Sequence, residues 1–295
     1  GGPDAMVYDS KNGYIYVANS YDNTVSVIDP NTNQVISVIF LGCSISSMIY
    51  DSFNKYIYAI SGDNAVFVID PNNNTVIANI FVGIAPDAIL YDPQNGYIYV
   101  TNEWSGTVSV INPNNNKVIT NIPVDGDPDA ILYDPDNGYI YVANSISNTV
   151  SVIDPNNNTV IANIPVGGSP NAMVYDPNNG YIYVANELDN TVSVINPNNN
   201  KVITNIPVGR GPITILYDSD NGYIYVANSI SNTVSVIDPN TNTVITNIPV
   251  GGGPDAMVYD SKNGYIYVAN EWSNTVSVID PNTNEVIANI PVGQQ

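Results

Sequence analysis

The stretch that decides the fold is Tyr139-Ile-Tyr-Val-Ala-Asn144, followed by Thr149-Val-Ser-Val-Ile-Asp154 and Thr159-Val-Ile-Ala-Asn-Ile-Pro-Val166, with Ala130-Ile-Leu-Tyr-Asp134 before it. These four short runs are rich in β-branched and aromatic residues and are separated by Asn, Asp, Gly and Pro, which is typical of strands joined by turns. None has the length or the 3.6-residue period of a helix. Tyrosines and aliphatic residues alternate along the first run, so neither face of that strand is polar. We therefore expect both faces of the sheet to be covered.

The same motif of about 42 residues occurs seven times in the 295-residue chain. The units cover 1–42, 43–83, 84–125, 126–167, 168–209, 210–251 and 252–295. Repeats of this length need their neighbours to bury their apolar faces. A blade packed between two others meets that need, so the sequence predicts an all-β, seven-bladed β-propeller with four antiparallel strands per blade, a to d from the axis outwards. Because the chain starts at strand a and ends after strand d, we expect the seventh blade to pack on the first without a shared strand.

The turns have physical reasons in the sequence. Asp-x-x-Asn-Gly joins strands a and b, and glycine accepts the positive φ that such a turn requires. Blade two departs from this pattern with Asn54-Lys55. The c–d turn reads Asp/Asn-Pro-Asn-x-Asn; its oxygens could imitate a calcium loop, but a calcium site needs 6–8 converging oxygens. We expect structural turns, no metal and no cofactor.

Five of the d strands contain a proline, which cannot donate to a ladder and is confined to edge strands. This places strand d at the edge of each blade. The prolines are Pro123, Pro165, Pro207, Pro249 and Pro291.

Charge and residue usage exclude several functions. The chain has 27 acidic and 6 basic residues, a net charge of −21, and the basic residues are scattered. Binding to nucleic acid or to an anionic membrane needs clustered cations, and no apolar run is long enough for membrane insertion. Histidine is absent and Cys43 is the single cysteine, which we expect to act as a small buried hydrophobic residue. The chain begins Gly1-Gly2 rather than with Met, which suggests processing or trimming.

Tyr99-Val100-Thr101-Asn102 spells YVTN, and five other blades read Tyr-Val-Ala-Asn, as at 16–19. The chain therefore resembles the YVTN-repeat β-propellers of archaeal and bacterial surface-layer and cell-surface proteins. Blade two departs from the signature with Tyr58-Ala59-Ile60. The resemblance implies extracellular display at the cell surface.

The seven units differ mainly in their b–c loops and in their d–a connections, which lie at the same end of an up-and-down blade. Loops on a rigid scaffold often carry function, so we expect this variable end to bind a partner, with Tyr21, Trp104 and Trp272 as aromatic anchors and the loop glutamates as an acidic rim. The alternative is that the large residues only cap the edge of the adjoining blade. The predicted partner-binding residues are Tyr21, Glu103, Trp104, Glu187, Leu188, Arg210, Glu271 and Trp272.

Blades one and two have Phe40 and Phe81 where the others have the strand-d proline, and Leu41 follows the first of them. An unprotected apolar edge can pair with another molecule, so we predict a lateral self-association surface here; the alternative is burial of both rings beneath strand c.

No break in the repeat pairs a nucleophile with a base, so we expect no enzymatic activity. The predicted function is that of a cell-surface structural or adhesion protein that binds other cell-surface proteins, cell-wall glycans or copies of itself. The alternatives are an extracellular recognition module for a glycan or protein and, less favoured, a lactonase-like or quinoprotein-like enzyme.

Overall fold

The computed structural model describes residues 2–293, and its described elements are strands apart from one turn of 3-10 helix, η1 (Glu103–Ser105). Each sheet contains four strands that follow one another in the sequence, and sequential neighbours pair antiparallel. The predicted strand-by-strand build of the repeat is therefore confirmed. Among the described residues, no helix is long and apolar enough to cross a membrane.

The first four sheets hold the following strands: β1 (Pro3–Tyr8), β2 (Ile15–Asn19), β3 (Thr24–Asp29), β4 (Gln34–Phe40); β5 (Ile45–Tyr50), β6 (Ile57–Ser61), β7 (Ala65–Asp70), β8 (Thr75–Phe81); β9 (Pro86–Tyr91), β10 (Ile98–Asn102), β11 (Thr107–Asn112), β12 (Lys117–Pro123); β13 (Pro128–Tyr133), β14 (Ile140–Asn144), β15 (Thr149–Asp154), β16 (Thr159–Pro165). The last three sheets hold these strands: β17 (Pro170–Asp176), β18 (Tyr181–Asn186), β19 (Thr191–Asn196), β20 (Lys201–Pro207); β21 (Pro212–Tyr217), β22 (Ile224–Asn228), β23 (Thr233–Asp238), β24 (Thr243–Pro249); β25 (Pro254–Asp260), β26 (Tyr265–Asn270), β27 (Thr275–Asp280), β28 (Glu285–Pro291).

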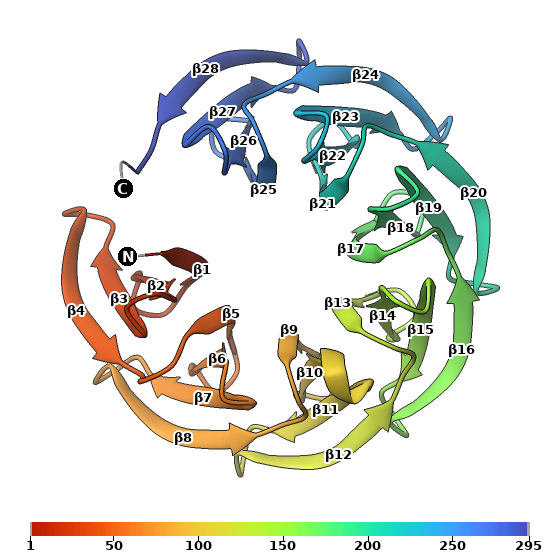
Figure 1. Cartoon of the computed structure of the whole chain (residues 1–295). Coiled ribbons are helices and arrows are strands. Elements are labelled where there is room, and N and C mark those ends of the chain that lie inside the picture. Colours follow the sequence, from red (N-terminus) through yellow and green to blue (C-terminus); the bar gives the residue numbers. More distant parts are fainter. Residues whose placement is uncertain (1, 294–295) are drawn as a thin grey trace. The chain divides into compact units, whose positions relative to one another are not determined.

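The sheets group into two compact units. Unit 1 extends to Tyr133 and includes Gly138–Val142 and Ile153–Ile161; unit 2 holds Asp134–Asn137, Ala143–Val152 and the chain from Ala162 onward. In unit 1 the first strands β1, β5, β9 and β13 lie side by side, and in unit 2 the same holds for β17, β21 and β25 (Figure 1).

The alternation of tyrosine and aliphatic residues explains how neighbouring sheets pack. In unit 1, Tyr99 on β10 packs in one cluster with Ile140 and Val142 on β14. In unit 2, Tyr183 on β18 packs in the same way with Ile224 and Val226 on β22. The tyrosine face of one sheet thus covers the aliphatic face of the next, and the second strands of the first six sheets are buried on both faces as expected. In the seventh sheet, Tyr267 on β26 is only half-buried and Ala269 is exposed.

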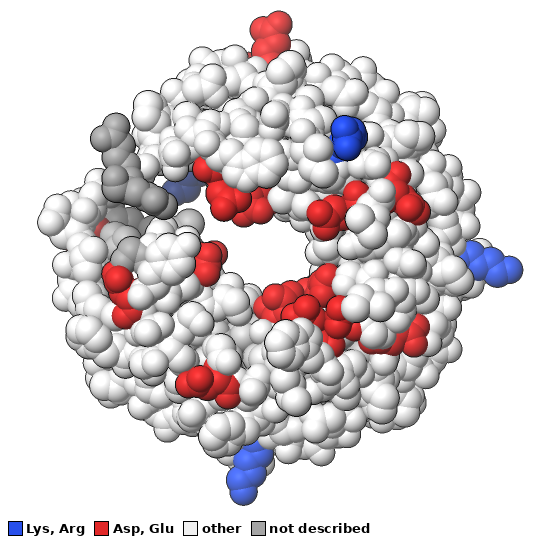
Figure 2. Space-filling model, in the orientation of Figure 1, with Lys and Arg blue, Asp and Glu red and all other residues white. Residues whose placement is uncertain are grey.

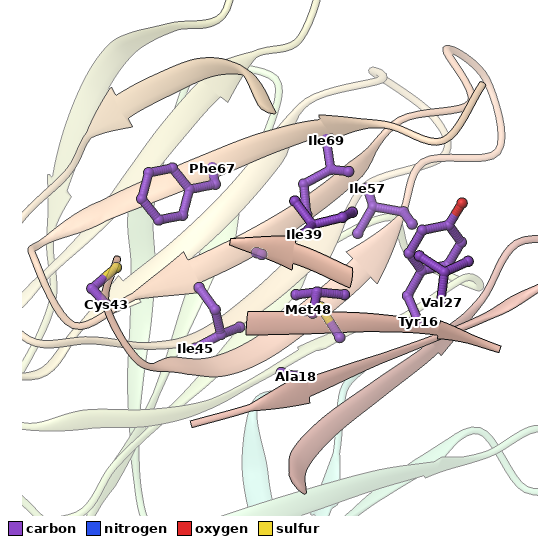
Figure 3. Close-up of a cluster of buried hydrophobic side chains, with 12 residues drawn as sticks. Tyr16, Ala18, Val27, Ile39, Cys43, Ile45, Met48, Ile57, Phe67 and Ile69 are labelled. Carbon is purple, nitrogen blue, oxygen red and sulfur yellow. The ribbon is translucent and has the colours of Figure 1, made fainter. Parts of the chain in front are cut away.

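The cluster between the first two sheets is the one that departs most from the repeat (Figure 3). Cys43, Ile45 and Met48 pack there with Phe67, and Cys43 is buried, as the sequence predicts. Burial raises the pKa of the Cys43 thiol, so the thiol is held in its neutral form.

The a–b turns connect neighbouring sheets through tyrosine hydroxyls. Asn179 Nδ2 donates to the hydroxyl of Tyr183 at 3.0 Å, and this hydroxyl donates to Asn242 Oδ1 of the next sheet at 3.3 Å. Equivalent contacts join Asn95, Tyr99 and Asn158 in unit 1. The turn asparagines therefore position the buried tyrosine rings as well as shaping the backbone.

The fourth strand lies at the edge of every sheet, as the strand-d prolines predict. Its side chains alternate between exposed and covered positions in β12, β16, β20 and β24. A buried isoleucine lies just before the last residue of the strand in six of the sheets. In the seventh sheet the equivalent Ile290 is 44% exposed.

Candidate functional site: the loop face

The b–c loop and the incoming d–a connection of a sheet are held together by hydrogen bonds. In blade three, Glu103 N donates to Ala85 O at 2.8 Å, and in blade seven Glu271 N donates to Gly253 O at 2.9 Å. A second bond ties four of the connections to the previous sheet, as when Gly253 N donates to Asn232 Oδ1 at 2.9 Å. We call the b–c loops and d–a connections of one unit its loop face. The two variable loop sets are at the same end of each sheet, as predicted.

One position of the b–c loop, which we call the loop tip, presents a large apolar or aromatic side chain to solvent in six sheets. In the second sheet Gly62 takes this position. The exposed fractions of the tip residues are Tyr21 83%, Trp104 75%, Ile146 71%, Leu188 74%, Ile230 50% and Trp272 63%.

Several tips lie against the backbone of the connection in their own blade. A Cβ atom built on Gly253 would be 2.6 Å from Cδ2 of Trp272, and one on Gly2 would be 2.6 Å from Cδ2 of Tyr21. Glycine at these positions therefore allows the ring to cover the chain while its other face remains in solvent. The capping alternative describes only part of this arrangement, since every tip stays at least half exposed.

Sequence reasoning named four of the six tips and missed Ile146 and Ile230. Both were visible as loop residues at the same repeat position as Trp104 and Trp272. A single isoleucine in a loop is not a distinctive sign of a binding residue, whereas a tryptophan is. Comparison of the same position across all units would have found them.

Acidic side chains accompany the tips. Glu103, Glu187 and Glu271 directly precede three of them, and Asn171 Nδ2 donates to a carboxylate oxygen of Glu187 at 3.3 Å. Arg210 lies in a connection, with its backbone N–H bonded to Ser231 Oγ and its side chain exposed. Figure 2 shows acidic side chains recurring from sheet to sheet on the face in view, whereas basic ones are isolated.

Asp87 is a site residue that the sequence did not reveal. Pro86 pairs with Asn102, with a register shift between Val100 and Asn102. Asp87 lies beside this shift, and in blade five the residue at the same position, Asn171, donates to Glu187 at 3.3 Å. The surrounding protein and, secondarily, the charge of Glu103 raise the pKa of Asp87 to about 6, although its side chain is solvent-exposed. A carboxylate with such a pKa can exchange protons near neutral pH.

The predicted lateral residues are divided by the structure. Phe40 and Phe81 are 81% and 74% exposed, so the alternative that strand c buries them is wrong. Leu41 is half-buried against the cluster between the first two sheets. Leu41 therefore packs with the core and does not form part of the exposed edge.

The turn carboxylates form hydrogen bonds within their own turns. Within residues 2–293, no group of three or more His, Cys, Asp or Glu side chains is placed to hold a metal ion. The turn carboxylates instead accept N–H bonds from their own turns: Asp238 Oδ1 takes one from Asn240 N at 2.9 Å.

Seven sheets of four antiparallel strands define a seven-bladed β-propeller, and comparison with known proteins agrees. The family model described as "Lactonase, 7-bladed beta-propeller" matches residues 56–201. The model described as "YNCE-like beta-propeller" matches residues 170–248 and 206–295. No curated protein matches the chain.

Solved structures resemble the chain along most of its length at low sequence identity. Hydrazine synthase of Kuenenia stuttgartiensis has a TM-score of 0.77 at 19% identity, covering 95% of both chains. Dihydro-heme d1 dehydrogenase NirN has a TM-score of 0.82 at 15% identity, covering 99% of this chain and 66% of its own. Virginiamycin B lyase from Staphylococcus aureus has a TM-score of 0.75 at 15% identity, covering 92% of both chains. At these identities the likeness concerns the fold.

The expectation that the chain has no enzymatic activity is wrong. The match of the family model described as "Lactonase, 7-bladed beta-propeller" to residues 56–201 points to an enzyme-like propeller family. The expectation relied on the lack of a nucleophile–base pair among the breaks in the repeat, but a carboxylate with a raised pKa, such as Asp87, can also act as an acid or base. These comparisons do not name a surface-layer protein.

Proposed function

We propose that the chain is a recognition propeller that is displayed outside the cell and binds a component of the cell envelope through the loop faces of its two units. The proposal rests on one observation: in six blades the same loop position holds a large apolar or aromatic side chain that is at least half exposed. Exposed apolar groups on loops that are held by packed sheets are typical of an interaction surface. The YVTN-like motif supports the extracellular location.

Binding of the purified chain to isolated cell envelopes tests this proposal. We expect the double variant Trp104→Ala/Trp272→Ala to bind at least tenfold more weakly, because aromatic anchors dominate interface energies. Phe53→Ala is the matched control, since Phe53 is 77% exposed but lies on an a–b turn at the other end of its sheet. Equal binding by the wild type and the double variant would contradict the proposal.

A second candidate function is lactone hydrolysis, which is favoured by the presence of Asp87 and Glu103 within the Lactonase-matched residues. In this reaction the Asp87 carboxylate accepts a proton from water while the water oxygen bonds to the lactone carbonyl carbon. The ring C–O bond then breaks and the leaving alkoxide takes up the proton, which yields a hydroxy acid. The surrounding protein and, to a lesser degree, the charge of Glu103 keep the pKa of Asp87 raised.

Hydrolysis of sugar δ-lactones, followed by pH-stat titration, tests this second function. We expect a rate that rises with pH through about 6 and falls at least tenfold in Asp87→Asn. Asp129→Asn is the control, because Asp129 occupies the equivalent position of blade four, where Ser145 replaces the glutamate. An unchanged rate in Asp87→Asn would eliminate the carboxylate pair as the reacting group.

A further inference from the structure

The loop face of unit 2 joins apolar tips in four successive blades. Ile146, Leu188, Ile230 and Trp272 are all exposed. The loops that carry them are connected through hydrogen bonds from Ser169 N to Asn148 Oδ1, from Gly211 N to Asn190 Oδ1 and from Gly253 N to Asn232 Oδ1, each 2.9 Å long. The tips therefore form a series on a backbone that is already ordered, so little conformational entropy is lost when a partner binds.

Carboxylates flank these tips more often than cations do. Glu187 and Asp189 lie on either side of Leu188, and Glu271 precedes Trp272. Arg210 is the only basic residue between Ala162 and Gly293 in a loop of this face, since Lys201 begins β20 and Lys262 lies in an a–b turn. An apolar partner without cations would leave these carboxylates desolvated at the contact, which is unfavourable.

We infer that the loop face of unit 2 binds a polypeptide segment in which basic residues alternate with apolar ones. The inference rests on the proposed recognition function and specifies its partner. Apolar side chains of the segment would pack on Leu188 and Ile230, while its lysine or arginine groups would pair with Glu187 and Glu271. The indole of Trp272 adds a favourable cation–π contact with the same cations. The net charge of −21 steers such a segment towards the chain.

Fluorescence anisotropy with three labelled twelve-residue peptides tests the inference on the full chain: one alternates lysine and leucine, one glutamate and leucine, and one lysine and serine. We expect the lysine–leucine peptide to bind at least tenfold more tightly than either of the others. Its affinity is expected to fall at least fivefold between 50 and 300 mM salt, because exposed charge pairs are screened.

Two double variants distinguish binding at the loop face from attraction to the overall negative charge of the chain. Glu187→Gln/Glu271→Gln is expected to weaken binding of the lysine–leucine peptide at least tenfold. The control Asp238→Asn/Asp280→Asn changes the charge equally on c–d turns, where blades three and five naturally carry Asn112 and Asn196; it should bind as the wild type does. Equal weakening in both double variants would overturn the inference, since the peptide would then respond to total charge alone.

The outcome also separates this inference from the proposed function. If envelope binding requires Trp104 and Trp272 but a neutral cell-wall oligosaccharide competes for it, without dependence on salt or on Glu187 and Glu271, the recognition function stands and the inference is overturned. If Leu188→Ala/Trp272→Ala changes binding of neither peptide nor envelope, both are overturned.

Discussion

At the residue scale, the turns show how different residue types adopt the same left-handed backbone conformation. The last asparagine of the c–d turn is left-handed in every blade, with φ between 53° and 57°. Asparagine tolerates this region, so the prediction from the turn sequence is confirmed. The a–b turns use glycine for the same purpose, as at Gly96 (φ 74°), but in blade two Lys55 adopts φ 67°.

Lys55→Gly should therefore stabilise the protein by about 1 kcal/mol, because the left-handed conformation costs an L-residue about 1–2 kcal/mol and glycine loses slightly more chain entropy on folding. Urea unfolding measures the difference. Gly96→Ala is the reverse control: a Cβ there meets nothing within 4 Å, so only backbone strain is added and stability should fall by about 1 kcal/mol. If Lys55→Gly unfolds at a lower urea concentration than the wild type, the contacts of the lysine side chain contribute more to stability than the relief of backbone strain does.

Tyr183→Phe is expected to destabilise the protein by about 1–2 kcal/mol, because it removes a buried hydroxyl that bonds to Asn179 and Asn242 and leaves their amides unsatisfied. Thermal unfolding followed by circular dichroism provides the measurement. Tyr21→Phe is the matched control. The Tyr21 ring is exposed, so the thermal stability of this variant should equal that of the wild type. Equal stability of both variants would mean that water satisfies Asn179 and Asn242 as well as the Tyr183 hydroxyl does.

At the element scale, the edge strands differ in one backbone group. Leu41 N donates to Asn23 O and Val82 N donates to Asn64 O, both at 3.0 Å. Since N–H groups alternate in direction along a strand, the N–H groups of Phe40 and Phe81 point away from the third strand. The other five blades have proline at this position and so offer no donor. Blades one and two thus combine an exposed aromatic ring with an open edge.

We expect this edge to support weak lateral self-association, with the apparent mass rising with concentration in sedimentation velocity. Phe40→Pro/Phe81→Pro should abolish the rise without loss of stability, because neither N–H takes part in the ladder. Phe81→Asp should weaken it as well. A wild-type chain that remains monomeric at millimolar concentration would contradict this prediction.

At the scale of the whole molecule, buried carboxylates are repeated from blade to blade. Asp51, Asp92 and Asp176 are fully buried at the a–b turns, and burial raises the pKa of each. Asp87 adds a further carboxyl group with a pKa of about 6. With a net charge of −21, ionisation of these groups opposes folding.

Stability should therefore increase as the pH falls from 7 to 5. A carboxyl group whose pKa is higher in the folded than in the unfolded chain binds its proton first in the folded state, so the destabilisation caused by its ionisation is full above pH 6 and disappears towards pH 4. Urea midpoints at pH 5, 6 and 7 measure the trend, and Asp87→Asn should reduce its slope. A midpoint that decreases on acidification would refute this assignment.

The sequence by itself determined the repeat, the four strands of each blade, their turns and the edge position of strand d. These features depend on local periodicity and turn chemistry, which are visible in neighbouring residues. It also located the loop face, because the variable loops follow from the strand order, and it named most of the exposed tips.

Only the tertiary structure decided which of those residues act together. Asp87 and Glu103 are sixteen residues apart in the sequence, and only the fold decides that the surrounding protein and, secondarily, the charge of Glu103 raise the pKa of Asp87. The sequence also does not determine which side chains are exposed. Phe40 ends β4 with its ring in solvent, whereas the next residue, Leu41, is half-buried against the core, and only the packing of the sheets decides this difference.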